Sequence, residues 1–113
     1  MKNRNCIEKN TDLTDTGFGY TLSLIGGKYK MMILYKLYEN EPFIRYNELK
    51  RDIGNISFKT LTITLKELER SNLIIRKEYP QVPPKVEYSF SNKGKSLIPI
   101  LNAMCDWGEK NRK

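Results

Sequence analysis

Histidine is absent from this 113-residue sequence, and only two cysteines, Cys6 and Cys105, are present. Without histidine the chain cannot form the Ser-His-Asp or Cys-His arrangements that activate a nucleophile. Two cysteines without clustered carboxylates make no convincing metal site. Gly26-Gly27 lacks the surrounding pattern of a phosphate-binding glycine loop. We therefore expect no catalytic residues, no metal and no cofactor, and we predict that the protein is not an enzyme.

Long apolar runs are also missing. No segment approaches the roughly 20 apolar residues of a membrane-spanning helix, and the first residues lead into polar sequence rather than the apolar core of a signal peptide. We therefore expect a cytoplasmic protein with no membrane partner. A chain of 113 residues has room for one domain with a modest core, which a dimer would help to stabilise.

Acidic residues are fewer than basic ones, since 13 Asp and Glu oppose 20 Lys and Arg and leave a net charge of +7. This balance favours polyanionic partners, although an ordinary solvated helix face would account for it equally well. Part of the excess lies between Arg45 and Lys85, where nine basic residues oppose five acidic ones. The charge excess thus overlaps the part of the chain with the clearest helix and strand patterns.

The N-terminal third predicts two helices behind a polar arm. Residues 1–16 offer several helix caps without a clear helix start, so we expect a flexible arm. A short helix is predicted over Phe18–Ile25, and Gly26-Gly27 ends it. A longer helix is predicted over Lys28–Tyr38, because four residues recur there at helical spacing, namely Met31, Leu34, Tyr35 and Tyr38. This second helix is expected to cross the core.

The middle of the chain has the pattern of a helix-turn-helix. Pro42 ends the preceding helix, and Phe43–Arg45 is a candidate strand. A short helix over Tyr46–Ile53 is separated from the next helix by only residues 54–56, which begin with glycine. Ser57 is a suitable N-cap for that next helix, which covers residues 57–71. Its buried side is marked by Leu61, Leu65 and Leu68.

The other side of this helix has an unusual composition for a solvated surface. Thr60, Thr62, Ile63 and Thr64 are weaker helix formers than the Glu, Lys and Ala that suit such a surface. Threonine hydroxyls can bind base edges or phosphates, and the methyl groups of Thr and Ile can contact the thymine methyl in a major groove. Packing under a neighbouring helix would also explain these residues, Thr64 in particular.

Two strands joined by a rigid turn follow. Leu73–Tyr79 and Val86–Phe90 are rich in β-branched and aromatic residues, which predicts strands. Three prolines between them stiffen the connection. We predict a wing over residues 76–86 whose projecting tip carries Gln81 and Lys85 to phosphates or the minor groove. An ordinary hairpin with a rigid turn would account for the same pattern.

A last helix is predicted over residues 91–110, with Ser91 as its N-cap. Pro99 lies well inside this helix and should kink or interrupt it. The apolar side chains of the helix exceed what a small core needs, so we expect a second subunit to cover part of them. The expected dimer contacts are Leu97, Leu101, Met104 and Trp107.

Most of the chain, from Leu22 onward, resembles the HxlR-type, MarR-like winged-helix transcriptional regulators of bacteria. The resemblance rests on Leu24–Lys28, Arg45–Leu49, Ile56–Thr62, Leu65–Glu69 and, most specifically, Val82–Tyr88. It implies a mostly α fold with a small β-hairpin (α+β), a winged helix-turn-helix with extra N- and C-terminal dimerisation helices. It also implies a homodimer whose two recognition helices read a pseudo-palindrome with half-sites roughly 34 Å apart.

Three departures from the family pattern matter. Tyr29 stands where the family usually has Trp, and Ile63-Thr64 replaces residues that are usually longer and polar. Many relatives carry Cys-Pro just before the first helix, and some use that cysteine as a sensor, but this chain has Thr16-Gly17 there. Cys6 lies too far upstream to inherit the role by alignment.

The cysteines allow a second hypothesis about regulation. Cys6 lies among basic residues that favour the reactive thiolate, whereas Cys105 is expected to pack as a small apolar residue. A contact between Cys6 of one subunit and Cys105 of the other would allow a disulfide switch, provided that the two lie close enough. A response to oxidative or electrophile stress is therefore one reading of this pair, and a structural or incidental role is the other.

The combined prediction is one winged helix-turn-helix domain over residues 1–113 that acts as a homodimeric, sequence-specific DNA-binding transcriptional regulator on double-stranded promoter DNA. The alternative is a winged helix used for protein contacts, because a fold does not dictate its function. The sequence does not identify an effector. The predicted DNA-binding residues are Ser57, Lys59, Thr60, Thr62, Ile63, Lys66, Arg70, Arg76, Lys77, Gln81 and Lys85.

Overall fold

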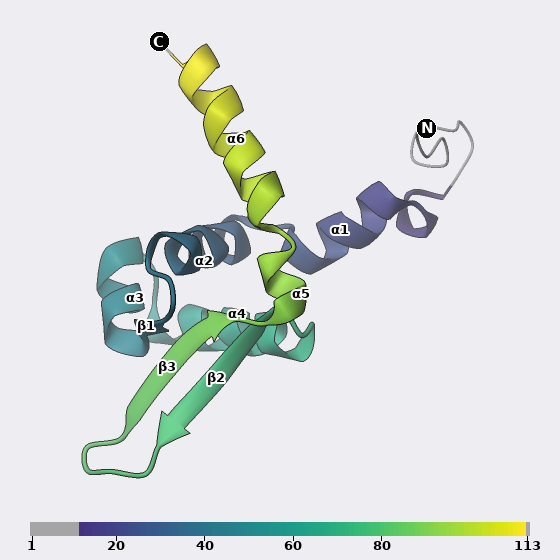
Figure 1. Ribbon diagram of the computed structural model, residues 1–113. Coiled ribbons are helices and arrows are strands. Elements are labelled where there is room, and N and C mark those ends of the chain that lie inside the picture. Colours follow the sequence, from purple (N-terminus) through teal and green to yellow (C-terminus); the bar gives the residue numbers. More distant parts are fainter. Residues whose placement is uncertain (1–11, 113) are drawn as a thin grey trace.

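The computed structural model describes residues 12–112, and most of them are helical (Figure 1). In chain order the elements are η2 (Leu13–Asp15), α1 (Gly17–Ile25), α2 (Lys28–Glu39), β1 (Ile44–Arg45), α3 (Tyr46–Ile53), α4 (Phe58–Arg70), β2 (Ile74–Tyr79), β3 (Lys85–Phe90), α5 (Asn92–Lys95) and α6 (Ile98–Asn111). The predicted mostly α fold with a small β component is confirmed. No helix in the described range is both long and apolar enough to cross a bilayer.

The core lies where α2, α3, α4 and the sheet pack together. α2 buries Ile33, Leu34 and Leu37 completely or almost so. The stripe predicted from spacing contains the buried Leu34 and two half-buried residues that pack on the core, Met31 and Tyr38. It is wrong at two positions, because it includes Tyr35, which is 37% exposed, and omits Ile33. Apolar residues occupy adjacent positions all round this helix, so only the placement of α3 and α4 decides which face is buried.

A third strand completes the sheet. The strand order is β1-β3-β2, and both pairings are antiparallel. The two residues of β1 pair with the middle of β3, with Ile44 opposite Tyr88 and Arg45 opposite Glu87. This confirms the short strand predicted around residues 43–45. It also anchors the start of α3 directly beside the hairpin, since α3 begins at the residue after β1.

The helix-turn-helix is formed by α3 and α4. Gly54 closes α3 with a φ of +83°, a left-handed backbone conformation that favours glycine. Ile56 in the turn is buried, and Ser57 accepts a hydrogen bond from the backbone N–H of Thr60 at 3.0 Å. Ser57 is therefore the N-cap, as predicted.

The C-terminal segment differs from the single helix predicted over residues 91–110. Ser91 does cap a helix, because its Oγ accepts from the N–H of Gly94 at 2.9 Å, but that helix, α5, ends at Lys95. A separate helix, α6, begins at Ile98 and has Pro99 in its first turn. Proline removes no intrahelical hydrogen bond there, since the first amides of a helix have no partner inside the helix. Pro99 thus lies in the first turn of α6, just after the interruption, rather than in the middle of one long helix.

The two terminal helices project from the body of the protein in different directions (Figure 1). At the N-terminal end, Thr16 caps α1 by accepting from the N–H of Gly19 at 2.9 Å, and η2 packs against α1. Regular structure therefore begins within the segment predicted as a flexible arm over residues 1–16. Residues 1–11 of that arm lie outside the described residues.

Candidate nucleic-acid interface

One face of α4 is covered by the core and the opposite face is open. Leu61, Leu65 and Leu68 are at most 1% exposed, which confirms the predicted buried side. The exposed side chains of α4 include four of the predicted DNA-binding residues, Lys59, Ile63, Lys66 and Arg70. Among the residues that the structure describes, neither Lys59 nor Arg70 is paired with a carboxylate.

The threonines of α4 are less available than the sequence analysis expects. The hydroxyl of Thr64 donates to the carbonyl oxygen of Thr60 at 2.7 Å, and Thr64 is buried. Thr60 is half-buried and shares a hydrogen bond between hydroxyls with Ser57. The hydroxyl of Thr62 lies 2.9 Å from that of Tyr46 on α3. Ile63, 47% exposed, is therefore the β-branched residue of this group that faces freely outward.

Beside α4, the β2–β3 hairpin forms the wing, and its tip differs from the predicted one. Gln81 is exposed, and Val82 at the tip is 98% exposed. Lys85 is not at the tip, because it is the first residue of β3 and pairs with Tyr79. Its ammonium lies 4.6 Å from the centre of the Tyr79 ring and 3.8 Å from Oε2 of Glu87. The side chain is thus held along the hairpin instead of projecting from it.

Carboxylates neutralise part of the positive charge on the wing. Glu87 is 9% exposed, accepts a hydrogen bond from the hydroxyl of Tyr79 at 2.9 Å and lies 4.0 Å from the guanidinium of Arg45 as well as near Lys85. Arg76 pairs with Glu78 at 3.2 Å. α4 and the hairpin each carry three cations and two carboxylates, and on the hairpin ion pairs hold Arg76 and Lys85.

A hollow of about 340 Å³ lies between α4 and the hairpin. Its polar lining includes the hydroxyls of Tyr46, Thr62 and Tyr88 and the cations of Lys66 and Arg76. Burial raises the pKa of Tyr88, while hydrogen bonding and charge from Arg76 oppose that shift. The Tyr88 hydroxyl therefore remains a neutral hydrogen-bond donor at physiological pH.

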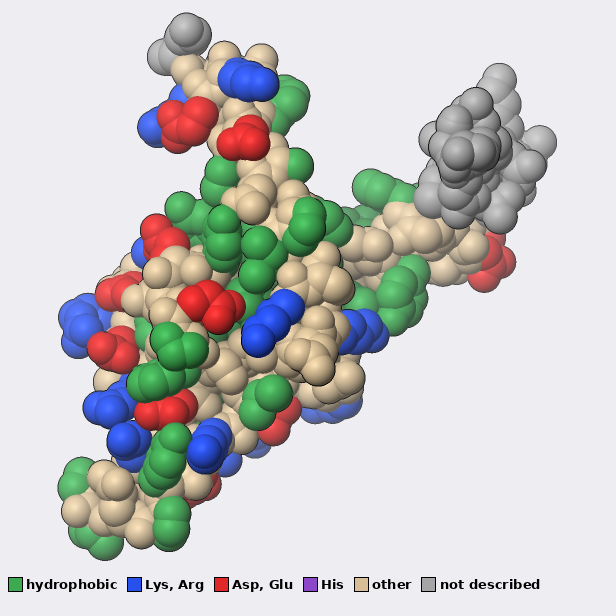
Figure 2. Space-filling view, viewed as in Figure 1, with side chains coloured by type: hydrophobic (Ala, Val, Ile, Leu, Met, Phe, Trp, Pro, Cys, Tyr) green, Lys and Arg blue, Asp and Glu red, His purple; other side chains and the backbone are tan. Residues whose placement is uncertain are grey.

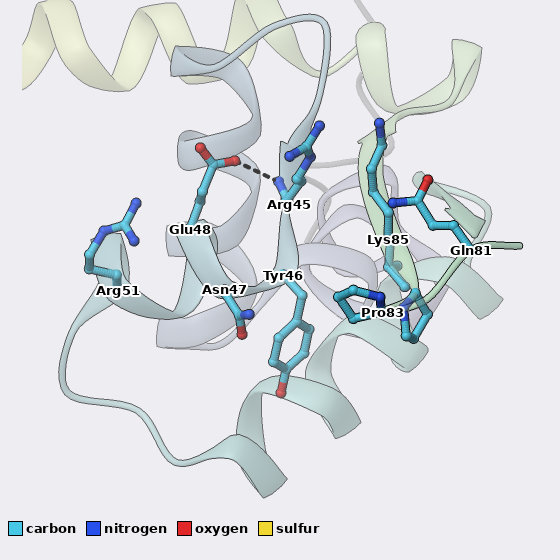
Figure 3. Close-up of a pocket in the computed structure, with 10 residues that line it drawn as sticks. Arg45, Tyr46, Asn47, Glu48, Arg51, Gln81, Pro83 and Lys85 are labelled. Atoms are coloured by element: carbon cyan, nitrogen blue, oxygen red, sulfur yellow. Dashed lines mark hydrogen bonds between the residues drawn. The ribbon is translucent and has the colours of Figure 1, made fainter. Parts of the chain in front are cut away.

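A second, more open hollow of about 660 Å³ adjoins the first, because Tyr46 and Val86 line both. Figure 3 shows five residues of β1 and α3 on one side, namely Arg45, Tyr46, Asn47, Glu48 and Arg51, and Gln81, Pro83 and Lys85 from the hairpin on the other. Glu48 accepts from the backbone N–H of Arg45 at 3.1 Å and so fixes the first turn of α3. The two hollows lie side by side along the hairpin side of the helix-turn-helix, and each carries cationic side chains within a partly apolar lining.

Several residues of this surface were not identified from the sequence. Arg45 and Arg51 are exposed basic residues beside the wing, and the sequence analysis gave Tyr46 only as the first residue of a short helix. Phe58, the first residue of α4, is 62% exposed. The two arginines could have been proposed as DNA contacts from their charge alone. The position of Tyr46 against Thr62 could not, because it depends on how α3 and α4 pack.

The terminal helices expose apolar side chains. On α1, Phe18 and Tyr20 are 58% and 52% exposed, and on α6 Met104 and Trp107 are 54% and 69% exposed. Figure 2 shows hydrophobic side chains on α1 and around the lower part of α6. Leu101, predicted as a dimer contact, is instead 4% exposed and belongs to the core of its own chain, and Leu97 is half-buried.

Of the two cysteines, the structure describes only Cys105. Cys6 lies outside the described residues. Cys105 is a free, half-buried cysteine on α6 beside an apolar hollow of about 330 Å³, whose other lining residues include Met31, Met32 and Leu101. Within residues 12–112 no cluster of His, Cys, Asp or Glu could hold a metal ion.

The fold and this surface together define a winged helix-turn-helix protein, with α3 and α4 as the helix pair and the β2–β3 hairpin as the wing. The model of the family described as HxlR-like helix-turn-helix matches residues 24–113. The chain belongs to this family, which confirms the resemblance seen in its motifs.

Known proteins similar to this chain are transcriptional regulators rather than enzymes. The HTH-type transcriptional regulator BH0655 of Halalkalibacterium halodurans is 61% identical over 101 residues, which cover 89% of this chain and 88% of the relative. A MarR-family regulator from Porphyromonas gingivalis W83 matches with a TM-score of 0.84 at 36% identity, over 93% of this chain and 100% of its own. The redox regulator HypR in its oxidised form matches with a TM-score of 0.76 at 42% identity, over 83% of this chain and 95% of its own. The chain is accordingly a transcriptional regulator with a helix-turn-helix fold.

Proposed function

We propose that the protein is a homodimer that binds a pseudo-palindromic promoter operator, with α4 of each subunit in the major groove and the hairpin on the DNA backbone or in the minor groove. The observation that carries this proposal is the open face of α4, where Lys59, Ile63, Lys66 and Arg70 are exposed next to the wing. A major groove about 12 Å wide admits one such helix.

The hollows between the helix-turn-helix and the hairpin suit the sugar-phosphate backbone. A helix that enters the major groove brings one DNA strand alongside it, and the hydroxyls and cations of the smaller hollow are donors for phosphate oxygens. Lys66 and Arg76 supply the charge, and the Tyr88 hydroxyl supplies a neutral donor. Arg45 of β1 and Arg51 of α3 add two cations in the larger hollow.

The homodimer is supported by the apolar surfaces of α1 and α6. Aromatic side chains such as Phe18 and Trp107, more than half exposed in the single chain, form the kind of surface that a partner covers. A dimer would present two copies of α4. Two half-sites one helical turn apart, roughly 34 Å, would then be read together.

Selection from random duplexes tests the DNA proposal directly. The purified full-length protein should enrich a pseudo-palindromic sequence, and its affinity for that sequence should fall steeply as salt is raised. A winged helix that serves protein contacts would enrich no sequence and would show little affinity for duplex DNA even at low salt. That result would overturn the proposal in favour of the protein-contact alternative.

A response to oxidative or electrophile stress is the second part of the proposal. It is supported by the similarity to the redox regulator HypR and by the half-buried thiol of Cys105 on an apolar, projecting helix. Diamide, a thiol oxidant, would take two electrons and two protons from Cys6 of one subunit and Cys105 of the other and leave a disulfide between them.

A non-reducing gel tests this switch. Diamide should yield a covalent dimer that reductant reverses, and the same treatment should change operator affinity. Cys6→Ser and Cys105→Ser should each abolish the covalent dimer. A covalent dimer that survives either substitution would contradict this pairing, and unchanged operator affinity in the oxidised wild type would contradict the switch.

A further inference from the structure

Phe58 is a large apolar side chain in an unusual place. It is the first residue of α4, and its side chain is 62% exposed even though two residues of α3 contact it. We infer that the Phe58 ring is a specificity contact, which meets the methyl group of a thymine in the major groove. This inference rests on the proposed DNA binding and adds to it the identity of a base that the protein reads.

The ring is held in a fixed position. The rings of Tyr46 and Phe58 lie parallel, with 6.2 Å between their centres and 7° between their planes. The Tyr46 hydroxyl also lies 3.3 Å from the backbone carbonyl oxygen of Phe58 and 2.9 Å from the Thr62 hydroxyl. The ammonium of Lys50 lies 4.5 Å from the centre of the Phe58 ring. α3 therefore orients the ring before any ligand arrives, which lowers the entropy lost on contact.

The location of the ring favours DNA over an apolar protein partner. Phe58 and Thr62 are four residues apart and so share one side of α4, and Lys59 and Ile63 lie next to them on the open face. Cations lie beside the ring, since Lys50 lies over it and the exposed Lys59 is the next residue of α4. A single apolar side chain beside cations suits the methyl group of a base, which phosphates flank. It suits the extended apolar surface of a protein partner less well.

The chemistry of this contact distinguishes bases by one group. In the major groove thymine presents a C5 methyl group that cytosine lacks, and apolar side chains, phenylalanine among them, contact it. Uracil keeps the hydrogen-bonding edge of thymine but has no methyl, whereas 5-methylcytosine has the same C5 methyl beside an amino donor in place of the thymine O4 acceptor. Phe58 should therefore respond to the methyl group itself.

The experiment uses the full-length protein and the sequence that it selects from random duplexes. Each dT is replaced in turn by dU at both half-sites, and the affinity of every duplex is measured. Burying one methyl corresponds to about fourfold in affinity, so loss of the contact in both half-sites of a dimer should weaken binding by about 15-fold. At the contacted position Phe58→Ala should bind dT and dU duplexes equally, and Phe58→Leu should keep an intermediate preference.

Phe43→Ala is the matched control, because Phe43 is another exposed phenylalanine but lies before β1, outside the helix-turn-helix. It should keep the dT preference of the wild type. The inference is wrong if the wild type is indifferent to dU at every position, or if Phe58→Ala retains the wild-type preference. Failure of the wild type to select any sequence would instead overturn the proposed DNA binding, and this inference with it.

Discussion

Replacing Lys59 by alanine should reduce the salt dependence of DNA binding without disturbing the fold. Lys59 is exposed in the first turn of α4, and no carboxylate within residues 12–112 pairs with it. Its removal therefore breaks no ion pair and opens no cavity. What it should remove is one phosphate contact from each subunit.

The expected magnitude follows from counterion release. Each phosphate contact contributes about 0.9 to the slope of log K against log salt, so a dimer that loses two contacts should lose about 1.8. Between about 50 and 200 mM salt, the affinity ratio of wild type to variant should then shrink by about 12-fold. The ratio should be the same for specific and random duplexes, because a phosphate contact carries no sequence information.

Fluorescence anisotropy titrations of a labelled operator at four or five salt concentrations measure this slope. Lys110→Ala is the matched control, since it removes the same charge from exposed α6, which projects away from α4 (Figure 1). It should leave the slope near that of the wild type. If Lys59→Ala and Lys110→Ala give equal slopes, the open face of α4 does not lie against the phosphates and the proposed docking is wrong.

Four further outcomes are expected. Lys85→Ala should weaken DNA binding less than Lys59→Ala in the same titrations, because Glu87 and Tyr79 hold Lys85 along the hairpin; an equal or larger loss would contradict this. Tyr46→Phe should lower the free energy of unfolding in urea by about 1 kcal/mol through loss of its hydrogen bonds, and an unchanged value would show that the hydroxyl contributes nothing. Gly94→Ala should lower the free energy of unfolding by on the order of 3 kcal/mol, because its Cβ would lie 2.0 Å from a backbone carbonyl oxygen. Full stability of this variant would require a backbone shift visible in its structure. Trp107→Ala should weaken the homodimer by on the order of 30-fold in sedimentation equilibrium, and an unchanged dimer would place the interface elsewhere.

The helix-turn-helix was predictable because its signals are local. Ser57 caps α4 through a hydrogen bond to a backbone amide three residues away, and Gly54 ends α3 through its own backbone conformation. The leucine spacing of α4 needed only the helical period to reveal the buried side. Each of these features depends on residues within a few positions of one another, which a single sequence displays directly.

The surface was less predictable because its properties depend on pairs that are distant in sequence. The sequence predicts Lys85 as a free cation at a loop tip, but the pairing of β2 with β3 brings it to Tyr79 and Glu87. Thr62 reads as a free hydroxyl, but the packing of α3 on α4 brings it to Tyr46. Leu101 reads as a dimer contact, but the turn between α5 and α6 directs it into the core.

The sequence by itself determined the helix-turn-helix, its cap, the proline-stiffened hairpin and membership of the HxlR-like family, since these rest on spacing, backbone preference and motif. Only the tertiary structure decided which face of α2 is buried, that β1 joins the sheet, and which polar groups remain free for a ligand. The physical reason is that burial and charge neutralisation depend on neighbours brought together by folding. Phe58 shows this most clearly, because its place beside Tyr46 and Lys50, with most of its ring still open, exists only once α3 and α4 have packed.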